Sequence, residues 1–172
     1  MQTYHDRLLT SAVLYLKEAV TNYSISLETD PDESDELSFL RSKAIIHIHI
    51  AAEMIMKDSI MAINWEDIFS SPKKADKSKL KSGNFKSITY GDCIKYLKRH
   101  SVFSKSELNV LHRLGIQRNK AFHFAHKITT PSLKSLITGT SNILLNYFNN
   151  HEDLLAFFNE DIADITAWSN IP

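Results

Sequence analysis

The sequence has few of the residues that build disulfide frameworks, tight turns or membrane spans. Its single cysteine, Cys93, excludes an internal disulfide and a cysteine-rich zinc site. Glycine and proline occur four times each in 172 residues, which is too few for a turn-rich all-β fold. No apolar run reaches the roughly 18 residues that a transmembrane helix requires. These absences predict one helical domain over residues 1–172 that makes no contact with a membrane.

An excess of charge of one sign is also absent. Twenty basic residues balance twenty acidic ones, so a nucleic acid would have to be held by a local patch of positive charge. The first residues, Met1-Gln-Thr-Tyr-His, lack the basic and then apolar start of a signal peptide. We therefore expect a cytoplasmic protein.

Apolar residues recur at helical spacing along most of the chain. The pattern predicts an all-α, up-down bundle of about five to six helices. Ser104 and Glu107 form a capping-box pattern at the start of one helix, and Thr130 with Pro131 is typical of the start of the next. The expected helices cover residues 4–26, 35–64, 91–100, 104–126, 132–149 and 151–168.

The second expected helix is apolar on nearly all sides, which is typical of the central helix of a bundle. Glu53 interrupts its apolar centre and needs a cationic partner there. Lys57, one turn later, and Arg118, farther along the chain, are both candidates. His47 and His49 lie about 200° apart on a helix and cannot share a metal as neighbours, so we interpret both as packed or surface residues.

Residues 70–87 are rich in lysine and poor in apolar residues, which predicts a mobile loop. The positive charge of this loop suits contacts with a phosphate backbone, although a solubilising surface loop has the same composition. The candidate RNA-binding residues of the loop are Lys73, Lys74, Lys77, Lys79 and Lys81.

The most informative stretch runs from Leu108 to His126. Each residue of a helix advances about 100°, so Asn119 and His123 fall about 100° and 140° from Arg118, on one side of the helix. Leu111, Leu114 and Phe122 fall within roughly 40° of Arg118, which places the guanidinium in the apolar stripe. Such a charge requires a buried carboxylate, a second subunit or an anionic ligand.

Arg118, Asn119 and His123 are together suited to phosphoryl chemistry. An arginine binds a phosphate through two hydrogen bonds, and a histidine that titrates near neutrality can move a proton to or from a ribose hydroxyl. His126 follows His123 by one turn and could assist it. The sequence offers no further nearby metal ligands and no phosphate-binding glycine loop, so we expect neither a metal nor a cofactor. His112 lies on the same side and is expected to pack.

The segment Arg118-Asn-Lys-Ala-Phe-His123 resembles the Arg-x(4 to 6)-His motif of the HEPN superfamily in its R-N-x-x-x-H form. The resemblance extends to the long apolar helix with its embedded acid, Glu53, and to the Gly-Asp-Cys-Ile-Lys-Tyr-Leu segment before the motif helix. It covers roughly residues 35–150. Members of this superfamily are small helical bundles, and many are metal-independent endoribonucleases that act as toxins or antiviral effectors.

The resemblance implies a homodimeric endoribonuclease whose site is formed by two copies of the motif. Arg118 would stabilise the phosphate charge, His123 would act as general base or acid on the 2′-hydroxyl, and Asn119 would orient one of them. Glu53 and His126 would support them. Some relatives do not cleave RNA, and some act beside an antitoxin-like nucleotidyltransferase partner. A non-catalytic dimerisation or regulatory module is therefore the alternative function.

Overall fold

The computed structural model describes residues 4–30, 32–124, 129–150 and 163, and this part of the chain is helical apart from its connections and one isolated bridge between Phe69 and Ser87. This confirms the predicted all-α helical bundle. The helix expected over residues 151–168 lies outside the described residues, except for Ala163. In chain order the elements are α1 (Tyr4–Glu28), α2 (Ser34–Ile63), the 3-10 helices η1 (Trp65–Ile68) and η2 (Pro72–Lys74), α3 (Lys77–Ser82), α4 (Tyr90–Arg99), α5 (Lys105–Phe124) and α6 (Thr130–Phe148).

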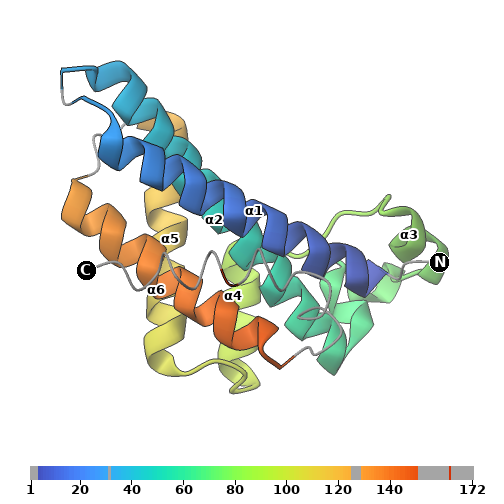
Figure 1. Cartoon of the computed structure of the whole chain (residues 1–172). Helices are drawn as coiled ribbons and strands as arrows, with labels where there is room; N and C mark the ends of the chain where they lie inside the picture. The colour runs from blue at the N-terminus through green and yellow to red at the C-terminus, as the bar shows by residue number, and fades with distance from the viewer. Residues whose placement is uncertain (1–3, 31, 125–128, 151–162, 164–172) are drawn as a thin grey trace.

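Helices α1 and α2 form a long antiparallel hairpin that spans the molecule (Figure 1). The buried residues of α1 recur every three or four positions, so one face of α1 packs against the bundle while the opposite face meets solvent. Several of them, including Ala12 and Ala19, are fully buried. The small side chains of these alanines suit the close approach of two helices that run side by side over many turns.

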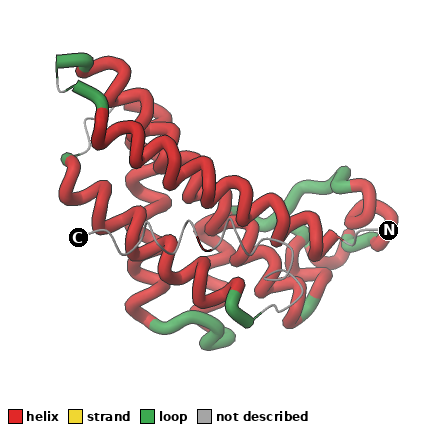
Figure 2. The backbone as a smooth tube through the Cα atoms, viewed as in Figure 1, coloured by secondary structure: helices red, strands yellow, loops and turns green. Residues whose placement is uncertain are grey.

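Helix α2 is the centre of the bundle, as its sequence predicts. It contacts α1, α4, α5 and α6, and its buried residues are distributed around much of its circumference. The tube in Figure 2 shows the other helices arranged around this hairpin. None of the described helices has the length and apolar content required to cross a membrane.

The starts of α5 and α6 test two predicted caps. The Ser104 hydroxyl accepts a hydrogen bond from the Glu107 amide at 3.2 Å, and the Ser104 amide donates to the Glu107 carboxylate at 2.7 Å, which confirms the capping box. The α6 cap is one residue earlier than predicted. Thr129 occupies the cap position, and Pro131 lies in the first turn, where its missing N–H costs no helical hydrogen bond.

The lysine-rich segment is more regular than the predicted loop. Within residues 70–87 the chain forms η2 and α3. The Asp76 carboxylate caps α3 by accepting hydrogen bonds from the amides of Ser78 and Lys79, and Gly83 ends it in the left-handed conformation at a φ of 74°. A carboxylate cap and a glycine stop therefore order a segment that composition alone marks as a loop.

A buried carboxylate joins three helices at the core. Asp58 in α2 is completely buried, and it accepts a hydrogen bond from the Tyr147 hydroxyl of α6 at 2.7 Å. The Nδ1 atom of His5 in α1 lies 2.5 Å from the other carboxylate oxygen. Burial and the nearby Asp58 charge raise the pKa of Tyr147, so its hydroxyl stays protonated and remains a donor. This cluster fixes the relative positions of α1, α2 and α6.

Replacing Tyr147 with Phe should lower the free energy of unfolding by about 1–3 kcal/mol, because the buried Asp58 loses a hydrogen-bond donor. Urea unfolding followed by circular dichroism measures this loss. Tyr15→Phe is the matched control, since no hydrogen bond of the Tyr15 hydroxyl is recorded within the described residues, and it should change stability by less than about 0.5 kcal/mol. Equal losses in the two variants would contradict the assigned role of the Tyr147 hydroxyl.

Candidate functional site in a cleft between α2, α4 and α5

A cleft of about 510 Å³ opens between α2, the start of α4 and the second half of α5. Its volume lies in the range of small-molecule binding sites. Both polar and apolar residues line its walls. The residues that line it are His49 and Glu53 from α2, Ser87, Ile88, Thr89, Tyr90, Gly91 and Ile94 from α4 and its lead-in, and His112, Gly115, Ile116, Arg118 and Asn119 from α5.

Arg118 is half-buried on one wall of the cleft, beside Asn119. Its Nη1 atom donates a hydrogen bond to the Asn119 side-chain oxygen at 3.1 Å, and its guanidinium carbon lies 5.1 Å from the centroid of the Phe122 ring. Within the described residues, no carboxylate forms an ion pair with Arg118. The guanidinium is therefore open to a ligand in the cleft.

The apolar stripe predicted around Arg118 is only partly buried. Leu111 and Leu114 are in the core as expected, whereas 62% of the Phe122 surface is exposed. Ile116 is also exposed, at 43%. The helical wheel places Phe122 correctly beside Arg118, but no described element covers the last turns of this face. The end of α5 consequently presents the Arg118 cation beside the exposed Phe122 ring, whereas Ile116 lies about 160° away around the helix.

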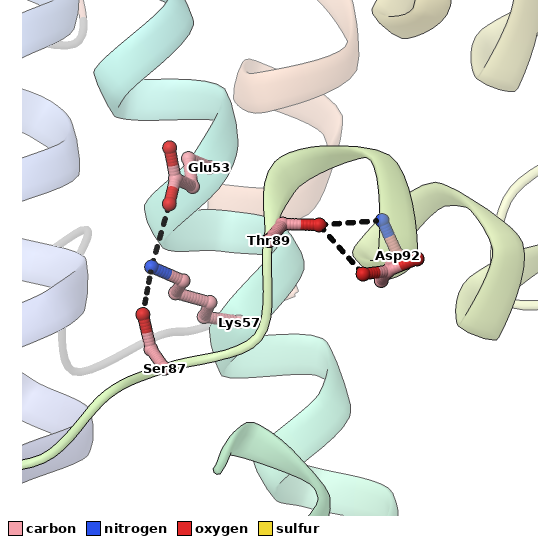
Figure 3. A network of polar contacts seen from close by, with 5 residues as sticks. All are labelled: Glu53, Lys57, Ser87, Thr89 and Asp92. Atoms are coloured by element: carbon pink, nitrogen blue, oxygen red, sulfur yellow. Dashed lines mark hydrogen bonds and ion pairs between the residues drawn. The ribbon is translucent and has the colours of Figure 1, made fainter. Parts of the chain in front are cut away.

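Lys57, and not Arg118, is the ionic partner of Glu53. The Lys57 ammonium donates to the Glu53 carboxylate at 2.6 Å and to the Ser87 hydroxyl at 2.9 Å (Figure 3). The prediction left Lys57 and Arg118 open as partners, and local spacing on α2 decides between them. By reaching Ser87, Lys57 also attaches the lead-in of α4 to α2.

The N-terminus of α4 points toward the cleft, and Thr89 caps it. The Thr89 hydroxyl accepts a hydrogen bond from the Asp92 amide at 3.3 Å and donates to the Asp92 carboxylate at 2.7 Å (Figure 3). Hydrogen bonds from Thr89 and from Lys95 hold the pKa of Asp92 below its usual range. The amides of Tyr90 and Gly91 precede this cap bond in the first turn and have no acceptor inside the helix.

Tyr90 attaches α4 to both walls of the cleft. Its hydroxyl donates to the Leu111 carbonyl of α5 at 2.8 Å, and its ring stacks on the imidazole of His49 with 4.0 Å between centroids. The Tyr90 ring also lies against Gly115 of α5, where an added Cβ atom would lie 3.0 Å from the ring. The absence of a side chain at position 115 is what allows the ring to lie against α5.

His49 is the buried titratable group of the cleft. Its side chain is only 6% exposed, and burial lowers its pKa to about 4. The Glu53 carboxylate opposes this shift, while the positive charges of Arg118 and Lys57 add to it. His49 is therefore a neutral imidazole at pH 7. The prediction of a packed or surface residue describes its burial but misses its place in the cleft.

The remaining predicted residues divide into three groups. His112, which we expected to pack, is exposed and lines the cleft. The backbone of His123 belongs to α5, but its side chain is outside the described part of the structure, and His126 lies outside the described residues entirely. The predicted RNA-binding lysines do not line the cleft, and Figure 1 shows α3 at the end of the molecule away from α5.

The cleft residues that sequence reasoning missed are His49, Tyr90 and the first amides of α4. They come from two helices that are distant in sequence, and neither helix carries a pattern that marks them as functional. Among the described residues, no three His, Cys, Asp or Glu side chains are grouped closely enough to hold a metal ion. Comparisons of the chain with models of protein families, with curated proteins and with solved structures found no match.

Replacing Gly115 with Ala should lower the free energy of unfolding by about 1 kcal/mol relative to Gly91→Ala. The new methyl group meets the Tyr90 ring, which cannot retreat without losing its contacts with His49 and Leu111. An added Cβ at Gly91 meets nothing within 4 Å, so the matched variant gains helix propensity without a clash. Denaturant unfolding of both proteins measures the difference. A Gly115→Ala protein as stable as Gly91→Ala would show that Tyr90 is free to move.

The lowered pKa of His49 should make the protein less stable as the pH falls from about 6.5 toward 4. In this window the unfolded chain binds a proton at His49 that the folded protein does not, so protonation favours unfolding. The contribution is at most about 1.4 kcal/mol per pH unit. Burial also lowers the pKa of His47. The informative quantity is therefore the slope of the free energy of unfolding against pH for the wild type, minus the same slope for His49→Asn. Identical slopes would mean that His49 titrates normally in the folded protein.

Proposed function

We propose that the protein is a metal-independent endoribonuclease of the HEPN type. One observation carries this proposal: Arg118 presents its guanidinium to a cleft of about 510 Å³, and no described carboxylate neutralises it. A cation held at the edge of a core without an ionic partner favours an anionic ligand. The spacing of Arg118, Asn119 and His123 on one helix supports a phosphodiester as that ligand, because cleavage of RNA requires both a phosphate-binding cation and a proton-transfer group.

In the proposed reaction, His123 accepts the proton of a ribose 2′-hydroxyl, and the 2′-oxygen attacks the adjacent phosphorus. The bond from phosphorus to the 5′-oxygen of the next nucleotide breaks, and that oxygen takes a proton from a solvent water molecule as it leaves. The product carries a 2′,3′-cyclic phosphate. Arg118 stabilises the additional negative charge on the phosphoryl oxygens, and Asn119, through its hydrogen bond with Arg118, holds the guanidinium in place.

The proposed site includes a second copy of the chain. Phe122 is exposed beside Arg118 on α5, so the end of this helix offers apolar surface to a partner. A second α5 laid against the first would cover this side chain and bring two Arg118 residues to one groove. Such an arrangement supplies the two motif copies that the HEPN resemblance implies.

The alternative function is a regulatory module in which the motif has a structural role. The described contacts of Arg118 are local, since they connect it only to Asn119 and Phe122 on its own helix. Contacts of this kind within one exposed helical surface contribute little to stability. The geometry thus favours a ligand-binding Arg118 over a structural one.

Replacing His123 with Ala should reduce cleavage of RNA by at least about 100-fold, because the reaction loses its proton-transfer group. Purified protein is incubated with total RNA in the presence of a chelator, and the products are resolved by gel electrophoresis. His100→Ala is the matched control, since His100 is an exposed histidine outside the cleft, and it should cleave as the wild type does.

Sedimentation of the same samples is the second control and should give the mass of two chains for each protein. Arg118→Ala should also lose cleavage while its unfolding midpoint stays within a few degrees of wild type. Wild-type protein that leaves RNA intact, together with an Arg118→Ala variant that is strongly destabilised, would refute the nuclease and favour the regulatory module.

A further inference from the structure

Three features of the cleft converge on a single region beyond the Arg118 motif. His49 is a polar side chain that is 94% buried, as its 6% exposure shows, and no hydrogen bond from it is recorded within the described residues. Ring nitrogens without a hydrogen bond would be unsatisfied buried polar atoms if they were sealed from solvent, and the His49 nitrogens are not of this kind. They therefore keep an accessible edge, and because His49 lines the cleft, this edge opens into it.

The first turn of α4 forms the adjacent wall. This helix has ten residues, and its N-terminus carries the positive end of the helix dipole. Thr89 satisfies only the Asp92 amide, so the amides of Tyr90 and Gly91 remain as donors at the rim of the cleft. Gly91 has open space where a side chain would be, and a ligand can consequently approach its backbone.

The charges that face this region leave a positive balance. Glu53 is neutralised by Lys57 at 2.6 Å, which leaves Arg118 as the charged side chain of the cleft without an ionic partner among the described residues. Asp92 lies in the first turn of α4, but it does not line the cleft, and its carboxylate bonds Thr89 and Lys95. Arg118 and His49 line the same cleft, and the positive charge of Arg118 adds to the lowering of the His49 pKa.

We propose that this region is a phosphate-ester subsite in which His49, the first amides of α4 and Arg118 bind one phosphoryl group. The His49 imidazole donates one N–H to a phosphoryl oxygen, the amides of Tyr90 and Gly91 donate to a second, and Arg118 binds the group from the opposite wall. The ester portion of the ligand lies along Ile94 and Ile116. This inference rests on the proposed function, because it places a substrate phosphate of the nuclease next to residues that the motif does not include.

The stack on Tyr90 is the reason why His49 suits this role. The ring of Tyr90 is itself held by Leu111, so the imidazole packed against it has a fixed plane. A fixed donor loses little conformational freedom when it binds. The imidazole is neutral in the free protein, and a bound phosphate dianion would stabilise its protonated form, so ligand binding should raise the pKa of His49.

The test is a titration of the full chain with inorganic phosphate and, separately, with adenosine 3′-monophosphate, followed by NMR of the histidine ring protons. The His49 resonances are assigned by their absence in His49→Asn. We expect saturable shifts at His49 with both probes and tighter binding of the ester. His49→Asn and Arg118→Ala should each weaken the affinity by at least about tenfold. His100→Asn, the same substitution outside the cleft, should bind both probes as wild type does.

Two results would overturn the subsite: wild-type protein whose His49 resonances do not respond to either probe, or a His49→Asn protein that binds both with unchanged affinity. The His49 resonances of the wild type are also identified by their NOEs to the Tyr90 ring, whose centroid lies 4.0 Å from that of the imidazole, so the test remains decisive even if His49→Asn does not fold. The outcomes also separate the two proposals. Phosphate binding at His49 without RNA cleavage would retain the subsite and refute the nuclease. RNA cleavage without phosphate binding at His49 would retain the nuclease and refute the subsite.

Discussion

The arrangement of the cleft depends on the packing of Tyr90 between two helices. Its ring lies on the His49 imidazole of α2, and its hydroxyl bonds the Leu111 carbonyl of α5. Gly115 makes this possible, because a Cβ atom at this position would lie only 3.0 Å from the ring, which is closer than carbon atoms normally pack. One side chain at the first position of α4 therefore contacts both α2 and α5 and holds the start of α4 against the two helices. Tyr90 thereby lines the cleft together with Arg118 and His49.

Much of the fold follows from the sequence, because helical periodicity is a local signal. The bounds of α1, α2, α4 and α5 agree with the predicted ranges to within a few residues, and α2 is central as its apolar circumference indicates. The capping box at Ser104 has the expected hydrogen bonds. The lysine-rich segment differs from the predicted loop, because the Asp76 cap and the Gly83 stop make part of it helical. The overall composition of the segment does not reveal the effect of two single residues.

The candidate site was less predictable, because it is formed by residues from three helices that are distant in sequence. The helical wheel placed Arg118 and Asn119 on one side of α5, and both line the cleft. It could not show that Phe122 is exposed, since exposure depends on which elements cover a face. His49 was interpreted only as packed or surface for a related reason. Its place in the cleft comes from the stack with Tyr90, a contact between residues 41 positions apart.

The bridge from Lys57 to Ser87 has a consequence for how a ligand enters. Since this bond and the Tyr90 contacts hold both ends of the α4 lead-in against its neighbours, the cleft exists before anything occupies it. Binding then requires little ordering of the backbone, so its entropic penalty is small and association approaches a lock-and-key process. A molecule too wide for the cleft would be rejected by shape, because the walls cannot separate unless these polar contacts break first.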